Sequence, residues 1–193
     1  MTTASPDRQP NFNLVAGEIN LDLIPPDWAL TPLRDKKAYI AGWPAQPYTI
    51  DQIRRELEDG KATGIGLITG QWSNEGGLIW VDIDGPEAIP ELEKLGGGTL
   101  SEIFPPTLTI SSGKKDRQRM LFSIPTSKIG LLPDKATIKI GISSFEILFR
   151  SRQGAIMGSH PETEGYFTTE HGNFEYAKNP PEMPEWLYSE IEK

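Results

Sequence analysis

The chain has 193 residues, which fits one domain with a core large enough to fold without disulfide bridges. The absence of cysteine excludes disulfides, a thiol nucleophile and cysteine-ligated zinc, and two histidines leave little room for a histidine-rich metal site. The net charge of −8 excludes a uniformly basic protein that coats DNA. With neither a long apolar stretch nor an apolar N-terminal leader, a soluble, cytoplasmic protein is expected.

Helix and strand signals alternate along the first half of the chain. Thr49 precedes an apolar pattern that Gly60 ends, which is typical of a helix with a capped start and a glycine stop. The predicted elements are, in chain order, a loose arm (1–20), an extended segment anchored by Trp28 and Trp43, a helix (50–60), a strand (64–70), a turn (73–77) and a strand (78–84). The two strands are predicted to pair as a hairpin.

The second half is predicted to be rich in short strands. Its elements are a helix (86–95) ended by three glycines, strands (108–110 and 120–124) around a polar loop (111–119), three strands (138–142, 144–150 and 154–157) and a C-terminal helix (184–192). The order is α+β, without repeats or low-complexity tracts. Residues 21–193 are therefore expected to form a single domain.

The end of the strand over 78–84 carries the sharpest chemical pattern. Because side chains alternate along a strand, Asp82 and Asp84 share one face, and Gly85 then lets the chain turn away. Two neighbouring carboxylates repel each other unless a cation lies between them, and Mg²⁺ favours one or two carboxylates together with phosphate oxygens. The pattern indicates a divalent-metal site; the alternative is a strand that ends in exposed acids.

A third carboxylate, Glu146, lies in the middle of the otherwise apolar strand over 144–150. An acid there is costly unless it is solvated, paired or bound to a metal. Three carboxylates from two strands would suit a two-metal site for phosphoryl transfer. The alternative is an ion pair with Arg150 or with a lysine of a neighbouring strand.

Positive charge is concentrated in residues 111–152, which hold nine Lys and Arg against three acids. A basic window inside an acidic protein indicates a local site for a polyanion, such as a triphosphate or a nucleic-acid backbone. The alternative is a solvated loop with an edge strand whose lysines prevent aggregation.

Two turns are candidates for phosphate binding. Residues 111–115 form a small, flexible, basic turn, and Arg119 follows on the next strand. Residues 158–161 follow a short strand, and the imidazole of His160 offers a hydrogen-bond donor to a phosphate oxygen. The alternative for His160 is an ordinary residue of a surface turn.

In their order and spacing, these segments resemble the primase–polymerase (prim-pol) domain of the archaeo-eukaryotic primase superfamily, as in bifunctional DNA primase/polymerase replication proteins. The resemblance runs from about Trp28 to Trp186. The matching segments are 28–33 with Lys36, Lys37 and 42–43, then 64–70, 77–85, 111–113 leading into 119–122, and Glu146 with Gln153 and 159–161.

The resemblance implies a two-lobed α+β fold of mixed sheets, with an RRM-like half and a central active-site cleft. It implies template-directed addition of an NTP or dNTP to a nucleic-acid strand, with Mg²⁺ or Mn²⁺ as cofactor and a single-stranded or primed DNA template as partner. Relatives often carry a helicase or another accessory domain after this one, so the chain is expected to be the N-terminal part of a longer protein. No membrane partner is expected.

Carried over to this chain, the resemblance assigns the catalytic and metal-binding acids to Asp82, Asp84 and Glu146. Together with the basic turn, it points to seven nucleotide-binding residues: Ser111, Ser112, Lys114, Lys115, Arg119, Ser159 and His160. The family usually has a histidine after the serines of the second motif. Here Arg119 takes its approximate place, or Gln118 if the alignment shifts by one residue, and a guanidinium can hold a triphosphate through two hydrogen bonds.

Two other classes of function stay open. The first is another Asp-x-Asp enzyme, such as a nucleotide-sugar transferase or a metal-dependent phosphoesterase, which a nucleotide-incorporation assay would separate. The second is a non-catalytic DNA-binding module of replication, which the missing histidine allows. DNA binding without metal-dependent catalysis would favour this second class.

Overall fold

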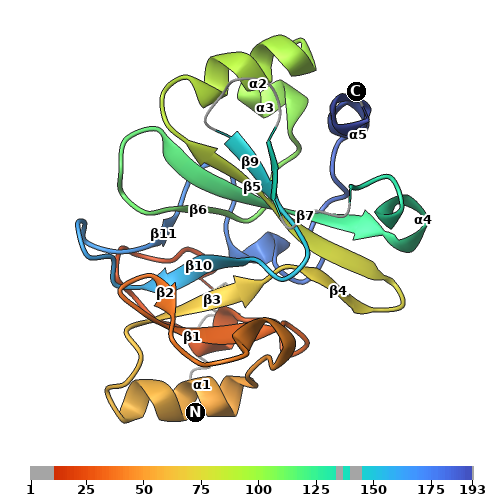
Figure 1. Ribbon diagram of the computed structural model, residues 1–193. Coiled ribbons are helices and arrows are strands. Elements are labelled where there is room, and N and C mark those ends of the chain that lie inside the picture. The colour runs from red at the N-terminus through yellow and green to blue at the C-terminus, as the bar shows by residue number, and fades with distance from the viewer. Residues whose placement is uncertain (1–10, 134–136, 140–144, 193) are drawn as a thin grey trace, which may run out of the picture.

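Two antiparallel sheets lie face to face in the computed structural model, which describes residues 11–133, 137–139 and 145–192 (Figure 1). The smaller sheet has the strand order β10 (Gln153–Gly158), β3 (Gly64–Ile68), β1 (Leu30–Arg34) and β2 (Lys37–Ala38). The larger has the order β11 (Phe167–Thr168), β6 (Thr109–Ser111), β7 (Arg117–Pro125), β5 (Gly76–Asp84), β9 (Phe145–Leu148) and β8 (Thr137–Lys139), and β4 (Gly70–Ser73) pairs with β5.

Helices cover the outer face of each sheet. Helix α1 (Ile50–Glu58) lies under the smaller sheet, and α2 (Ala88–Gly96), α3 (Leu100–Ile103) and α5 (Glu185–Ile191) lie over the larger one (Figure 1). The remaining short helices are α4 (Thr126–Ile129), η1 (Leu21–Leu23), η2 (Trp43–Ala45) and η3 (Phe174–Tyr176). The predicted α+β class is confirmed. Mixed sheets were expected, but the strands of the described ladders all pair antiparallel, and only an isolated bridge between Ser123 and Glu182 is parallel among the described residues.

The alternation predicted for β5 is confirmed by the two cores that it separates. Trp80 belongs to the core between the sheets, whereas Ile79, Val81 and Ile83 belong to the core under α2, α3 and α5. Asp82 shares the face of Trp80, because side chains two residues apart point the same way. The predicted metal pair therefore faces the smaller sheet and not the helices.

The hairpin predicted between residues 64–70 and 78–84 is wrong. Strand β3 ends at Ile68 and pairs with β1 and β10 of the smaller sheet, whereas β4 is the strand that pairs with β5. Between them, Gly70 has a φ of 129°, a conformation that favours glycine, and there the chain leaves one sheet for the other. The apolar run that predicted one strand therefore spans two.

Strand β1 was not predicted, because Pro32 stands in the middle of it and the surrounding segment is rich in proline. The carbonyls of Ala29 and Leu33 accept hydrogen bonds from the β3 side, so the missing N–H of Pro32 points to the other side. There β2 pairs only with Leu33 and Arg34. Proline costs no ladder hydrogen bond at this position.

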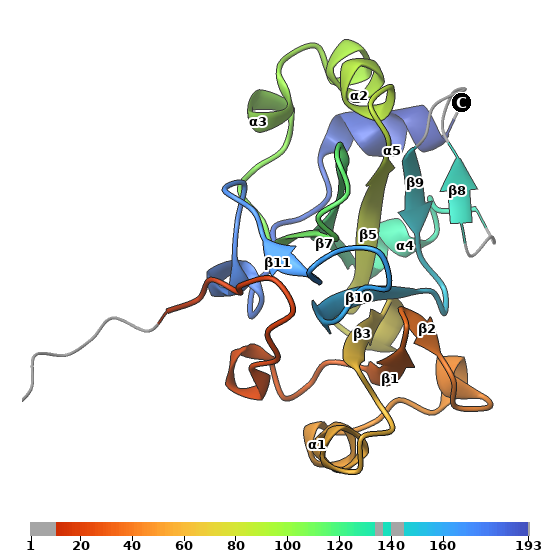
Figure 2. The ribbon, with the colours of Figure 1, turned by 90° about the vertical axis from the view of Figure 1, so that its left-hand side faces the viewer.

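Half of the predicted N-terminal arm packs against the body of the protein, beside β11 (Figure 2). The Leu14 side chain is buried, and its carbonyl accepts from the N–H of Thr168, as the carbonyl of Phe12 does from Phe174. Residues 1–10 lie outside the described residues, as do parts of the strands predicted over 138–142 and 144–150. No helix in the described part is long and apolar enough to cross a membrane.

Gly154 of β10 lies close against Trp80 of the larger sheet. A Cβ atom built there would lie 2.5 Å from Nε1 of Trp80, whose side chain is fully buried. We expect Gly154→Ala to lower the free energy of unfolding by about 1–3 kcal/mol, because the indole would have to shift within a packed core. Urea denaturation checks this.

Gly130→Ala is the matched control, because Gly130 has an ordinary helical φ and a Cβ built there meets no atom within 4 Å. It should leave stability unchanged or raise it by less than about 1 kcal/mol. Equal effects of the two substitutions would contradict the tight packing at Trp80.

Candidate active site

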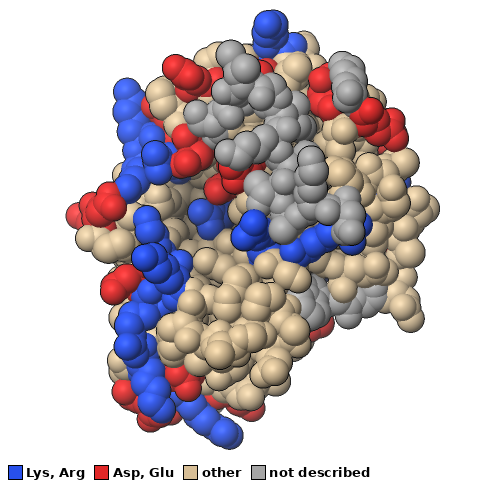
Figure 3. All heavy atoms as spheres, viewed as in Figure 1, with Lys and Arg blue, Asp and Glu red and all other residues tan. Residues whose placement is uncertain are grey.

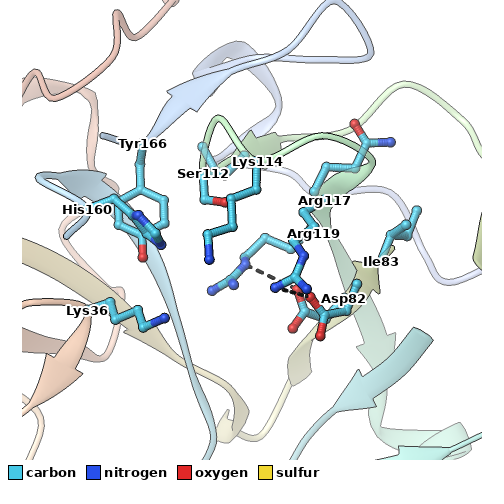
Figure 4. Close-up of a pocket in the computed structure, with 12 residues that line it drawn as sticks. Lys36, Asp82, Ile83, Ser112, Lys114, Arg117, Arg119, His160 and Tyr166 are labelled. Carbon is cyan, nitrogen blue, oxygen red and sulfur yellow. Dashed lines mark ion pairs between the residues drawn. The ribbon is translucent and has the colours of Figure 1, made fainter. Parts of the chain in front are cut away.

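A cavity of about 240 Å³ opens where the gap between the two sheets reaches the ends of β5 and β7 (Figure 3). Figure 4 draws the side chains that line it. They are Lys36, Asp82, Ile83, Asp84, Ile110, Ser112, Lys114, Arg117, Gln118, Arg119, His160 and Tyr166. Six of the ten residues predicted for the site are among them.

Segments far apart in the chain form the walls. Strands β5 and β7 supply the acids and the arginines, and the turn between β6 and β7 supplies Ser112 and Lys114 (Figure 4). Opposite them, the turn between β1 and β2 supplies Lys36, and the segment after β10 supplies His160 and Tyr166. The cavity is thus bordered by both sheets, as expected for a cleft between two lobes.

The acids and the arginines face each other across the β5–β7 ladder. The register places Asp82 opposite Arg119 and Asp84 opposite Arg117, and directly opposite residues share a face of the sheet. Arg119 Nε lies 3.4 Å from Asp82 Oδ1, and Arg117 Nη1 lies 2.9 Å from Asp84 Oδ1 (Figure 4). Each carboxylate of the predicted metal pair therefore has its own guanidinium partner.

Asp82 is the less exposed of the two acids: 24% of its side chain is exposed, against 55% for Asp84. Burial raises the pKa of Asp82 above its ordinary value, and the charges of Asp84 and Glu146 add to this effect. Arg119 acts in the opposite direction by favouring the ionised carboxylate. The ionised form of Asp82 is therefore stabilised by a positive charge beside it.

Glu146 lies beside Asp82 on the next strand but does not line the cavity. The β5–β9 register places Glu146 opposite Asp82, and its side chain is half-buried. Within the described ranges, no three His, Asp or Glu side chains are grouped closely enough to hold a metal ion. Asp82 and Asp84 supply the hard oxygen donors that Mg²⁺ and Mn²⁺ accept, so they fit a metal whose remaining ligands are water and phosphate oxygens.

The turn between β6 and β7 divides its predicted residues between two roles. The hydroxyl of Ser111 donates to the carbonyl of Arg117 at 3.0 Å and accepts from the N–H of Gly113 at 3.1 Å, so it shapes the turn. Ser112 and Lys114 line the cavity. Lys115 is exposed and does not line the cavity, so its side chain belongs to the surface of the turn.

His160 is 7% exposed, so the alternative of an ordinary surface turn is wrong. Its Nδ1 accepts from the backbone N–H of Glu162 at 3.2 Å, which leaves the proton of the neutral ring on Nε2. Burial lowers the pKa of His160, and the charges of Lys36 and Lys114 lower it further. Its neighbour Ser159 is exposed and donates to the carbonyl of Thr63 instead of lining the cavity.

Among the cavity residues that sequence reasoning did not assign to the site are Lys36, Arg117 and Tyr166, whose side chains carry a charge or a hydroxyl. Arg117 shares its face with Arg119, a signal that was lost because residues 111–119 were assigned to a loop, whereas β7 begins at Arg117. Lys36 lies in a tight turn where both Asp35 and Lys36 have a positive φ. Tyr166, whose ring lies edge-on to His160 at 5.6 Å, carried no signal in the sequence.

The lowered pKa of His160 predicts a dependence of stability on pH. A histidine whose pKa falls on folding stabilises the protein above its unfolded pKa of about 6.5, and this contribution is lost as the pH falls. We therefore expect His160→Gln to cost stability at pH 7.5 and to cost less at pH 5. Melting temperatures of both proteins at the two pH values check this.

His171, whose pKa is also lowered by burial, is present in both proteins, so its contribution cancels in the comparison. A difference in melting temperature that stays the same at both pH values would contradict the assigned neutral state of His160.

One family of proteins matches the chain. The family described as "Bifunctional DNA primase/polymerase, N-terminal" matches residues 20–186, which is most of the chain. No curated protein sequence matches the chain.

Proposed function

Because the chain belongs to the bifunctional DNA primase/polymerase N-terminal family, we propose that it is a template-directed nucleotidyltransferase that adds NTP or dNTP to a nucleic-acid strand. One observation carries the proposal beyond the family. A single cavity brings two strand-borne carboxylates together with Lys36, Lys114 and two arginines. Acids that suit a divalent cation and bases that suit a triphosphate are the two parts that such a reaction needs.

Asp82 and Asp84 would hold the Mg²⁺ or Mn²⁺ that the family implies. When bound, the metal would lower the pKa of an attacking 3′-hydroxyl and offset the charge that develops on the phosphates. The protein contributes the fixed positions of the two carboxylates, because both stand on one face of β5, between β7 and β9. Glu146, opposite Asp82, would add negative charge to the same side of the sheet.

The triphosphate would lie against the basic wall of the cavity. Arg119 is held at the middle of the cavity by its strand, and Lys114 reaches in from the turn above it (Figure 4). The Glu162 N–H contacts Nδ1 of His160, so the Nε2–H would be available to a phosphate oxygen. At any pH above the lowered pKa of His160, the neutral ring keeps this donor. Lys36 closes the opposite side from the smaller sheet.

The DNA template would contact basic side chains outside the cavity. Lys115 is exposed on the turn that carries Lys114, next to the cavity mouth. Contacts of this kind go mainly to phosphates, so DNA binding should weaken steeply with salt and depend little on sequence.

Removing either acid tests the proposed metal site. We expect Asp82→Asn and Asp84→Asn each to lower the rate of nucleotide incorporation on a primed template by several orders of magnitude, because metal stabilisation supplies many kcal/mol of the barrier reduction. Single-turnover extension with Mn²⁺ measures the rate.

The control is Asp51→Asn, an equally conservative change at an exposed acid in the first turn of α1. It should incorporate nucleotides at the wild-type rate. Activity within tenfold of the wild type in the Asp82→Asn, Asp84→Asn double variant would refute the assignment. DNA binding by the wild-type protein without any metal-dependent incorporation would favour the non-catalytic DNA-binding alternative instead.

Glu146→Gln separates a role at the metal from a role in stability. If the charge of Glu146 supports the metal at Asp82, the Mn²⁺ concentration for half-maximal incorporation should rise severalfold while the melting temperature changes little. A lowered melting temperature with an unchanged Mn²⁺ titration would assign Glu146 to a structural ion pair instead.

A further inference from the structure

The ion pairs in the cavity join groups that the proposed function needs for different partners. Asp82 and Asp84 are the acids proposed for the metal, and Arg119 and Arg117 lie in the space proposed for the triphosphate. A carboxylate binds either a guanidinium or a metal with the same oxygens, and a guanidinium binds either a carboxylate or a phosphate with the same N–H groups. Neither partner is fully available while the pairs are closed.

We propose, on the basis of the proposed function, that Arg117 and Arg119 act as exchangeable counter-ions that make metal and nucleotide binding depend on each other. In the absence of both ligands the guanidinium groups hold the two carboxylates. When metal and triphosphate are both present, the carboxylates turn to the metal and the arginines turn to the phosphates. Arg119 is then a competitor of the metal for Asp82 when nucleotide is absent, and a ligand of the nucleotide when both are bound.

The charges in the cavity favour this exchange. The two acids and the two arginines cancel, and Lys36 adds a positive charge close by. A divalent cation alone would have to displace a guanidinium and leave it unpaired beside the new positive charge. A triphosphate alone would meet the two carboxylates. Each ligand removes the obstacle to the other, so their binding should be positively coupled.

The geometry allows the exchange without a change of the sheet. The backbone register fixes all four residues on adjacent strands, so only side-chain torsions have to change. The Asp82–Arg119 contact of 3.4 Å is long for a charge-assisted hydrogen bond, and it is made through Nε. The described residues also group no three metal-binding side chains, so a metal held here lacks protein ligands that the phosphates would supply.

The experiment measures Mn²⁺ binding to the nucleotide-free protein, by the electron paramagnetic resonance signal of free Mn²⁺. We expect Arg119→Gln to tighten Mn²⁺ binding about fivefold or more, because the competing guanidinium is gone. The same variant should bind dATP more weakly in EDTA. Arg117→Gln should also tighten Mn²⁺ binding. Because the side chain of Arg117 is more exposed than that of Arg119, this second variant should fold even if Arg119→Gln does not.

Lys114→Gln is the matched control, since it removes the same charge from the same cavity. Lys114 is paired with Glu162 and not with either acid of the metal pair. Under an exchange mechanism it should leave Mn²⁺ affinity nearly unchanged. If it tightened Mn²⁺ binding as much as Arg119→Gln, a general electrostatic effect would replace the proposed exchange.

The reciprocal measurement uses Asp82→Asn. It should weaken Mn²⁺ binding and, in EDTA, tighten dATP binding, because Arg119 is released and a negative charge is removed. If Asp82→Asn left Mn²⁺ binding unchanged, the metal site of the proposed function would fail. If it weakened Mn²⁺ binding while neither arginine variant strengthened it, the exchange alone would be overturned.

Discussion

The register between β5 and β7 is the constraint on which the site depends. Nine consecutive pairs join Gly76–Asp84 to Arg117–Pro125, and a shift of β7 by one residue would turn both arginines toward the helices, away from the acids. Both ends of the ladder are fixed. At one end Gly76 lies too close to the carbonyl of Ile124 for a side chain, and at the other the N–H of Gly85 donates to the carbonyl of Asp116 at 3.0 Å.

The same face of β5 changes from core to cleft within two residues. Trp80 is fully buried against Gly154 of the smaller sheet, whereas Asp82, next along the face, already lines the cavity. The close packing of the sheets at Trp80 therefore sets the inner limit of the cleft. The burial of Asp82, with its raised pKa, follows from its place at this border. Strand β5 therefore carries both a core residue, Trp80, and a residue of the cavity, Asp82.

Patterns within one strand were predictable from the sequence, and contacts between strands were not. The alternation of β5 and the capped start of α1 at Thr49 are local, and the structure confirms them. The partner of β3 depends on Gly70, where one apolar run is divided between two sheets. Tyr166 lines the cavity because the chain after β10 turns back toward the site. No local sequence pattern predicts such a long-range contact. Alternation along β7 would have placed Arg117, had its strand been extended to that residue.

The arginine at position 119 determines the electrostatic balance of the cleft. At neutral pH a histidine in this place would be largely uncharged, and it would leave the carboxylate opposite without a permanent counter-ion. A guanidinium stays charged at any working pH and cancels the charge of Asp82 in the resting protein. Burial raises the pKa of Asp82, and the charge of Arg119 opposes that shift by favouring the ionised carboxylate. Under the proposed exchange, a cation binds Asp82 fully only when the carboxylate leaves Arg119.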